Sequence, residues 1–168
     1  MKSILIHFIL LLSFIGCSHE NKMPSIVLVL SNIGVSSLDS KTLFSQNEIM
    51  QKLLSYEVEM FTAWENGASV NVMRVLYNSH EVMIITPTIA DKNAQQYVKN
   101  ISITSDYIEN PFNIKIGTLY DKNAFSTCQE IQETIICKQK EFNNIELLFK
   151  KNLNHKWFLK EILWNANA

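Results

Sequence analysis

Residues 56–77 read YEVEMFTAWENGASVNVMRVLY, and this stretch decides the fold. Polar and apolar side chains alternate over residues 56–64, as in a strand that buries one face. The turn-forming residues Glu65-Asn66-Gly67-Ala68 follow, and residues 70–77 are again rich in apolar side chains. A second turn sequence at residues 78–81 leads to the apolar residues 82–86. The stretch therefore predicts consecutive hairpins of a meandering antiparallel sheet.

Further strands are predicted on both sides of these hairpins. Residues 26–35 are dense in Leu and β-branched side chains, which indicates a buried first strand with Gly34 at a bulge or turn. Pro87 ends the strand that precedes it, because proline cannot donate to a strand ladder. Four more strands are predicted at residues 97–104, 134–138, 144–150 and 157–164.

Two helices are predicted beside the sheet. Over residues 42–54 the apolar side chains recur at helical spacing, with Thr42 as the N-cap. Residues 119–126 predict a second, short helix, and residues 91–96 a single helical turn. Strands exceed helices and do not alternate with them, so the expected class is α+β, a single domain whose antiparallel meandering sheet carries both helices.

The N-terminus has the layout of a lipoprotein export signal. Lys2 precedes a short apolar run, and Phe14-Ile15-Gly16-Cys17 resembles a lipobox, in which a small residue stands directly before a lipid-carrying Cys. The apolar run is shorter than the roughly 20 residues that span a bilayer. We expect a signal peptide at residues 1–16, a tether at 17–25 and one domain at 26–165. The alternative is an ordinary signal peptide with an incidental Cys.

Lipidation of Cys17 predicts where the protein resides. A diacylated and N-acylated Cys carries more than one chain, and two chains suffice for stable attachment. Ser18 follows Cys17, and in enterobacterial-type sorting a residue other than Asp there directs a lipoprotein to the outer membrane. The expected location is the cell envelope, on the outer membrane facing the periplasm.

Composition excludes some classes of partner. Removal of the signal removes Lys2 and leaves 14 basic against 16 acidic residues. Nucleic-acid binding draws on clustered Lys and Arg, so this partner is not expected. Arg74 is the only Arg in the chain, which limits bidentate recognition of phosphate or carboxylate.

Three Cys are present, and the lipid would consume Cys17. Cys128 and Cys137 then form an even pair in an oxidising compartment, which predicts a disulfide. A redox-active pair would be expected to have only two residues between the cysteines. A zinc site would need two further ligands, and His155 is the only downstream His. Both alternatives are weaker than the disulfide.

A catalytic site is not evident in the sequence. Of the four His, only His80 and His155 lie in the domain, and both fall in expected hairpin turns, where a solvated side chain is the ordinary interpretation. Glu57 and Glu59 share one face of a strand, as acid/base carboxylates or, more simply, as a charged outer face. The four Gly are scattered, so no phosphate loop is formed. We expect no enzymatic activity and no cofactor.

Two other groups of residues are candidates for binding sites. Asp106 and Glu109 flank a loop, but the spacing of a calcium loop is absent around them, so no metal is expected. Several aromatic residues could form a ligand-binding face, although aromatics near strand ends usually fill cores. These residues are Trp64, Phe149, Trp157, Phe158 and Trp164.

Several segments together resemble the RpoE-regulated lipoprotein family of envelope proteins. The similarity runs from about Gly34 to Trp164, and its most specific part combines Ile116-Gly117-Thr118, Cys128-Gln129 and Cys137-Lys138. The other similar segments are residues 32–38, 42–49, 97–103, 114–115 and 160–164. The resemblance implies an exported lipoprotein with one α+β domain and one disulfide, made under envelope stress. It implies no activity.

The expected function is a non-catalytic outer-membrane lipoprotein that binds an envelope protein partner or supports the envelope under stress. One alternative is an inhibitor or immunity protein directed against a cell-wall hydrolase or a toxin. Another is a carrier of a small molecule or lipid, which requires a sizeable apolar cavity. A protruding loop would favour the inhibitor, a deep apolar pocket the carrier, and a flat apolar patch assembly with another protein.

Overall fold

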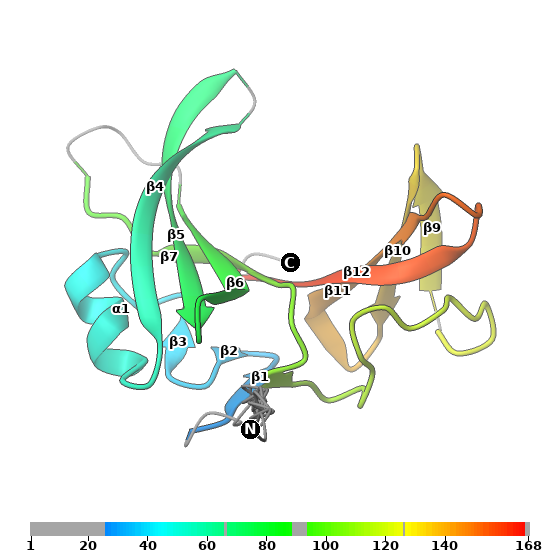
Figure 1. The fold of residues 1–168 in the computed structure, drawn as a ribbon, viewed down its shortest axis with the longest axis horizontal. Helices are drawn as coiled ribbons and strands as arrows, with labels where there is room; N and C mark the ends of the chain where they lie inside the picture. Colours follow the sequence, from blue (N-terminus) through cyan, green and yellow to red (C-terminus); the bar gives the residue numbers. More distant parts are fainter. Residues whose placement is uncertain (1–25, 66, 89–93, 126, 167–168) are drawn as a thin grey trace, which may run out of the picture.

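The computed structural model describes residues 26–65, 67–88, 94–125 and 127–166, and over these it contains two sheets and one helix (Figure 1). The expected signal peptide, Cys17 and the tether lie outside the described residues. No helix in the described part of the chain is long and apolar enough to cross a membrane. The elements in chain order are β1 (Leu28–Ser31), β2 (Gly34–Val35), β3 (Leu38–Asp39), α1 (Gln46–Lys52), β4 (Glu57–Glu65), β5 (Ala68–Tyr77), β6 (His80–Pro87), β7 (Val98–Ile103), β8 (Ile108–Glu109), β9 (Thr127–Ile131), β10 (Thr134–Gln139), β11 (Phe142–Lys151) and β12 (Trp157–Asn165).

Eight strands form one large sheet in the order β4-β5-β6-β7-β12-β11-β10-β9. Every neighbouring pair is antiparallel. The hairpins predicted from residues 56–86 are confirmed, since β4 pairs with β5 and β5 with β6. The sheet is therefore two meanders, β4–β7 and β9–β12. They join where β7 pairs with β12, for example Ile103 with Ile162.

A second sheet has the order β3-β2-β1-β8, and its β1 and β8 strands run parallel. The single strand predicted over residues 26–35 is wrong in its length, because the chain turns after Ser31 and β2 pairs back on β1. Gly34 has a φ of +150°, and a Cβ there would overlap the carbonyl oxygen of Leu38. Only glycine fits this close approach between β2 and β3.

The helix is shorter than predicted. It begins after Ser45, whose hydroxyl accepts a hydrogen bond from the backbone N–H of Glu48 at 3.3 Å. Thr42, the predicted N-cap, is buried, and its hydroxyl instead donates to the carboxylate of Asp39 at 3.0 Å. Of the predicted helical turn at 91–96, residues 91–93 lie outside the described residues, and residues 94–96 contain no helix.

The second predicted helix does not form in residues 119–125, and Ser126 lies outside the described residues. Leu119 makes a β-bridge to Phe158 instead. The backbone N–H of Gly117 donates to the carbonyl of Leu159 at 2.7 Å, and that of Tyr120 donates to the carbonyl of Trp157 at 2.9 Å. Residues 118–120 therefore lie extended along β12, and residues 121–124 form a turn in which the backbone N–H of Ala124 donates to the carbonyl of Asp121 at 3.1 Å. The α+β class with two helices is also wrong, because the described residues are mainly β-strand with one short helix.

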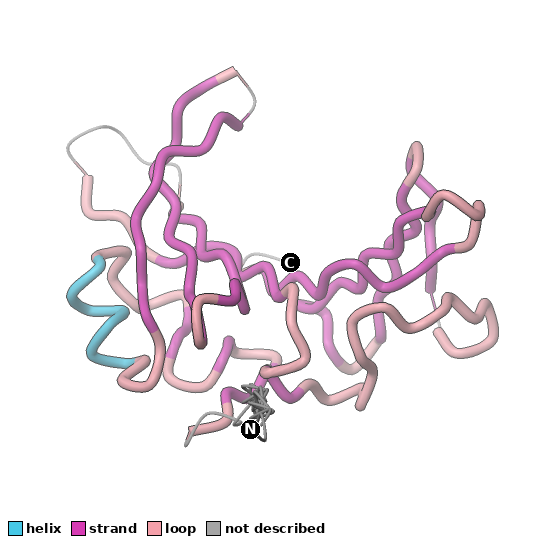
Figure 2. The backbone as a smooth tube through the Cα atoms, viewed as in Figure 1, coloured by secondary structure: helices cyan, strands magenta, loops and turns pink. Residues whose placement is uncertain are grey.

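The large sheet is strongly curved, so its two faces have different surroundings (Figures 1 and 2). Its convex face packs against α1, the small sheet and the segment of residues 105–125, and this packing makes the core. The two sheets contribute Leu28, Val35, Met83, Leu147 and Trp164, among others. Alternate residues of the same strands point to the concave face, since successive side chains of a strand point to opposite faces.

Candidate binding surface

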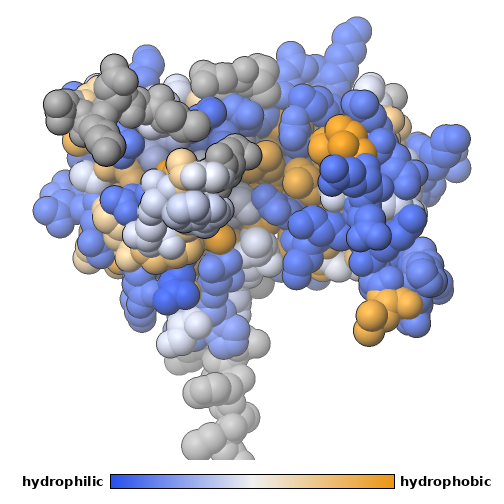
Figure 3. All heavy atoms as spheres, turned by 90° about the horizontal axis from the view of Figure 1, so that it is seen from above, coloured by the Kyte–Doolittle hydropathy of each residue, from blue (hydrophilic) through white to orange (hydrophobic). Residues whose placement is uncertain are grey.

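The concave face of the eight-stranded sheet, called here the open face, is the candidate functional surface. Figures 1 and 2 show no described helix or strand over it. Figure 3 looks onto this side of the molecule and shows orange apolar side chains lying between blue polar ones. A sheet face of this size that none of the described elements covers is a candidate for contact with another molecule.

One row of directly paired residues crosses all eight strands of the open face. The register of each neighbouring pair places one residue of the next strand opposite the last, from β4 to β9. We call it the cross-strand row. Its members in sheet order are Glu59, Arg74, Ile84, Ser102, Leu163, Glu146, Lys138 and Thr127.

Ion pairs occupy both arms of the cross-strand row. On the β4–β5 arm the Nε of Arg74 lies 2.7 Å from Oε2 of Glu59, and its guanidinium lies 5.8 Å from the ring centroid of Phe61. On the β10–β11 arm the Nζ of Lys138 lies 2.6 Å from Oε1 of Glu146. Each pair is partly exposed, so its contribution to folding is small, about 0–1 kcal/mol. They leave charged side chains oriented on the open face.

The centre of the row is less charged. Ile84, Ser102 and Leu163 are half-buried there. On the same face, Thr86 lies opposite Asn100. Within the described part of the chain, the Thr86 hydroxyl and the Asn100 side-chain carbonyl oxygen are buried and have no hydrogen-bond partner. Buried polar atoms without partners are unusual in folded proteins and often mark functional positions.

A small hollow lies at the β9 end of the open face. It has a volume of about 220 Å³ and is lined by Thr127, Gln129, Ile131, Ile136, Lys138 and Glu146. Ile131 is exposed at its rim. The hollow is large enough for one apolar side chain of a partner. It is below the usual size of a small-molecule site, roughly 300–1,000 Å³.

Larger hollows lie on the other side of the molecule, along the segment of residues 104–125. One of about 400 Å³ is lined by Thr104 to Tyr107 and Ile116, and one of about 510 Å³ lies between Phe112 and Gln139. Both open widely to solvent. Asp106 is one of the two carboxylates that the sequence suggested as cation ligands. It accepts a hydrogen bond from the backbone N–H of Ile116 at 2.7 Å. Its carboxylate therefore holds the loop that shapes the smaller hollow.

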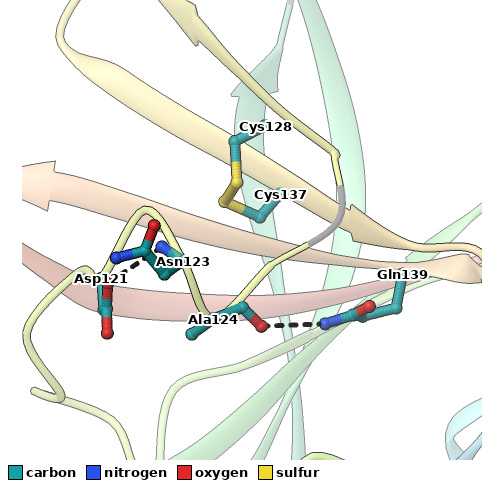
Figure 4. Close-up of a disulfide and its surroundings, with 6 residues drawn as sticks. All are labelled: Asp121, Asn123, Ala124, Cys128, Cys137 and Gln139. Atoms are coloured by element: carbon teal, nitrogen blue, oxygen red, sulfur yellow. Dashed lines mark hydrogen bonds between the residues drawn. A yellow bond between two sulfur atoms is a disulfide. The ribbon is translucent and has the colours of Figure 1, made fainter.

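The predicted disulfide is present between Cys128 on β9 and Cys137 on β10 (Figure 4). The two residues are directly opposite each other in the sheet, and their Cα atoms are 4.1 Å apart. Beside them, the side-chain amide of Gln139 donates to the carbonyl of Ala124 at 3.4 Å. The disulfide joins the last two strands of the sheet and thereby braces the β9 edge of the open face.

The residues considered for catalysis or metal binding do not come together. His80 and His155 lie exposed in two different hairpin turns. Glu57 and Glu59 share a strand face, as predicted, and Glu59 pairs with Arg74. Glu109 is exposed on β8. Within the described ranges no group of three or more His, Cys, Asp or Glu side chains is placed to hold a metal ion.

The aromatic residues do not share one exposed face. Trp164 and Phe149 are buried in the core, where the indole N–H of Trp164 donates to the carbonyl of Asn32 at 3.0 Å. Trp157 and Phe158 are half-buried. Trp64 is 77% exposed near the end of the β4–β5 hairpin. This hairpin projects beyond the rest of the sheet (Figure 1).

Comparison with known proteins identifies the family. Residues 21–165 match the model of a family described as a protein of unknown function, DUF1131. The chain belongs to the DUF1131 family. Curated proteins give no match. The crystal structure of the uncharacterized protein yfeY from Escherichia coli is similar, with a TM-score of 0.63 and 21% sequence identity over 81% of this chain and 98% of that chain. At this identity the likeness shows a shared fold.

For this DUF1131 protein the sequence did not indicate the cross-strand row. Its members are spread from residue 59 to residue 163 and become neighbours through the pairing of β7 with β12. The alternation within each strand was the only signal. It predicts which residues share a face of one strand, but not which residues of distant strands lie opposite each other.

Proposed function

We propose that this protein is a non-catalytic lipoprotein of the outer membrane that binds an envelope protein through its open face. The observation that carries the proposal is the cross-strand row, where paired charges flank a weakly polar centre on a sheet face that no described helix or strand covers. Protein interfaces commonly combine an apolar centre with a polar rim. The concave shape suits a partner that inserts a convex edge or loop.

The position of the first strand of the domain supports this proposal. β1 lies on the convex side, opposite the open face (Figure 1). If Cys17 carries the lipid, the short tether attaches on that side, and the open face is directed away from the membrane toward the periplasm. The resemblance to the RpoE-regulated lipoprotein family further suggests that synthesis rises under envelope stress, which transcript measurement after heat or ethanol shock would test.

Site-specific crosslinking in cells tests the binding surface. A photoreactive p-benzoylphenylalanine would replace Gln129, which is exposed on the open face, or Lys41, which is exposed on the convex side and serves as the control. We expect one discrete adduct from position 129 and none from position 41. Arg74→Gln combined with Lys138→Gln should reduce that adduct at least fivefold with the fold unchanged. Equal adducts from both positions would contradict a specific open-face partner.

An inhibitor or immunity function is the second candidate, and the projecting β4–β5 hairpin favours it. Trp64 stands near the hairpin end with 77% of its surface exposed, and exposed Trp side chains are frequent anchors of protein interfaces. The same photoreactive residue in place of Trp64 separates the two proposals. A stoichiometric adduct with a cell-wall hydrolase from position 64, and none from position 129, would favour inhibition.

Lipid attachment is tested separately. Cys17→Ala should move the protein from the membrane fraction to the soluble periplasmic fraction, and mass spectrometry of the wild-type protein should find three acyl chains on Cys17. Sedimentation of the variant with membranes would contradict the anchor.

A further inference from the structure

The convex side carries a group of exposed apolar side chains that the core does not use. These are Ile26, Val27, Val29, Ile33 and Leu54, called here the base patch. Two of them are strongly exposed, Ile33 at 74% and Leu54 at 80%. Single exposed apolar residues are ordinary on protein surfaces. A group on adjoining segments requires an explanation.

Hydrogen bonds hold the two segments of the base patch together. The hydroxyl of Tyr56, two residues after Leu54, donates to the carbonyl of Ile26 at 3.1 Å. The Nζ of Lys52 donates to the carbonyl of Ser37 at 3.3 Å, and the hydroxyl of Ser37 donates to the carbonyl of Lys52 at 3.4 Å. The start of β1 and the segment before β3 therefore adjoin the end of α1 and the turn to β4, while Ile33 stands in the β1–β2 turn at the other end of β1.

The exposure of β1 follows from its register in the small sheet. Leu28 and Leu30 are buried, whereas Val29 between them is exposed. A strand at the surface of a domain normally places polar residues on its outer face. Here the outer position of β1 is apolar, and Val27 continues the same face toward the start of the strand.

We propose that the base patch rests on the surface of the lipid bilayer to which Cys17 is anchored. This inference rests on the proposed lipid attachment. Only eight residues separate Cys17 from Ile26, so the chain holds Ile26 within about 30 Å of the anchored Cys, at roughly 3.3–3.6 Å per residue. Figure 1 shows β1 and the α1–β4 turn together on the side opposite the open face.

Weak attraction suffices for such a contact. A tether this short raises the local concentration of bilayer to the millimolar range, so a patch that would not bind membranes alone is occupied when anchored. The Lys52–Glu48 pair beside the patch, at 3.7 Å, sums to zero charge, and all five members of the patch are uncharged. The contact is therefore apolar, and it does not require anionic lipid. It would also fix the orientation of the open face away from the membrane.

Photocrosslinking on vesicles tests this inference without relying on acylation in the cell. The mature chain from Cys17 is purified with its disulfide closed, and the Cys17 thiol is coupled to maleimide-phosphatidylethanolamine in phosphatidylcholine vesicles. p-Benzoylphenylalanine replaces Ile33 or Leu54 in the base patch. The control is the same replacement at Leu153, which is 99% exposed in the β11–β12 turn. Because all three positions are exposed, the three variants should retain the fold. Comparison of their circular dichroism spectra with that of the wild type checks this.

Lipid adducts at positions 33 and 54 should exceed those at position 153 at least fivefold, with the same yield when one third of the lipid is phosphatidylglycerol. Equal yields at all three positions would overturn the inference, as would adducts formed only on anionic vesicles. Adducts between two protein copies at positions 33 and 54 would show a self-interface instead. Because the anchor is attached chemically, failure of the base patch is distinguishable from failure of lipidation, which the Cys17→Ala fractionation and the mass spectrometry of Cys17 report.

Discussion

The two faces of the eight-stranded sheet are built from the same strands and differ in what covers them. On the convex face Phe149, Ile162 and Met83 are fully buried beneath the loops, α1 and the small sheet. On the open face the interleaved residues Ser102 and Leu163 are half-buried, and charged pairs stand at the arms. The difference shows that one face of this sheet stabilises the fold, while the described elements leave the other face partly exposed.

Removal of a core ring should have the largest effect. Phe149→Ala deletes a side chain that contacts Tyr120 and Phe125 at ring-centroid distances of 5.2 and 5.4 Å. The cavity should lower the free energy of unfolding by about 3–5 kcal/mol. The matched open-face variant Leu163→Ala should lose only about 1–2 kcal/mol, because its side chain is already half solvated. Urea denaturation measures both, and equal losses would mean that the open face is packed.

Loss of the disulfide should rank second. The double variant Cys128→Ser, Cys137→Ser releases a crosslink that spans nine residues, and the unfolding free energy should fall by roughly 2–3 kcal/mol in the chain-entropy model. If the open face binds a partner, binding should also weaken, because the bond braces β9. Thermal unfolding of the wild-type protein with and without reductant measures the same loss, because reductant opens the disulfide. If reductant left the midpoint of thermal unfolding of the wild type unchanged, the prediction would be contradicted.

A smaller effect is expected at the junction of the two sheets. Burial raises the pKa of Tyr56 above its ordinary value of about 10, and the neighbouring Tyr77 raises it further. The folded state therefore holds the phenol proton more tightly than the unfolded state, and stability present below pH 10 is lost as pH rises above it. Tyr56→Phe removes the hydrogen bond to the carbonyl of Ile26. At pH 7 its free energy of unfolding should therefore be about 0.5–1.5 kcal/mol lower than that of the wild type.

The same variant should show a shallower decline of stability than the wild type as the pH rises above 10. Guanidinium unfolding at a series of pH values measures both slopes. Identical slopes would contradict the assignment to Tyr56.

The smallest effect on stability is expected from the open-face charges. Arg74→Gln removes an exposed ion pair with Glu59 and should change the unfolding free energy by no more than about 1 kcal/mol. Lys138→Gln should change the unfolding free energy by a similarly small amount. A loss above 2 kcal/mol in either variant would show that these charges stabilise the fold, which would weaken their assignment to binding.

Much of the strand pattern was predictable, because alternation is local. The β4–β5–β6 hairpins follow from residues 56–86, and the pairing of Cys128 with Cys137 follows from cysteine number. The helix at residues 119–126 was wrong because the backbone of that segment bonds to β12, nearly 40 residues later. The extent of the first strand was wrong because the chain turns after Ser31 and pairs back on itself. The extent of α1 was wrong because Ser45, and not Thr42, caps the helix.

The sequence by itself determined the hairpins and the disulfide, and it predicted a lipid anchor, since each depends on residues near one another in the chain or on the number of cysteines. Only the tertiary structure decided that β7 pairs with β12, which joins two meanders into one sheet and aligns Glu59 with Thr127 along a single row. Pairing between distant strands depends on how whole surfaces pack, and no local pattern encodes it. The open face and the base patch both arise at that level.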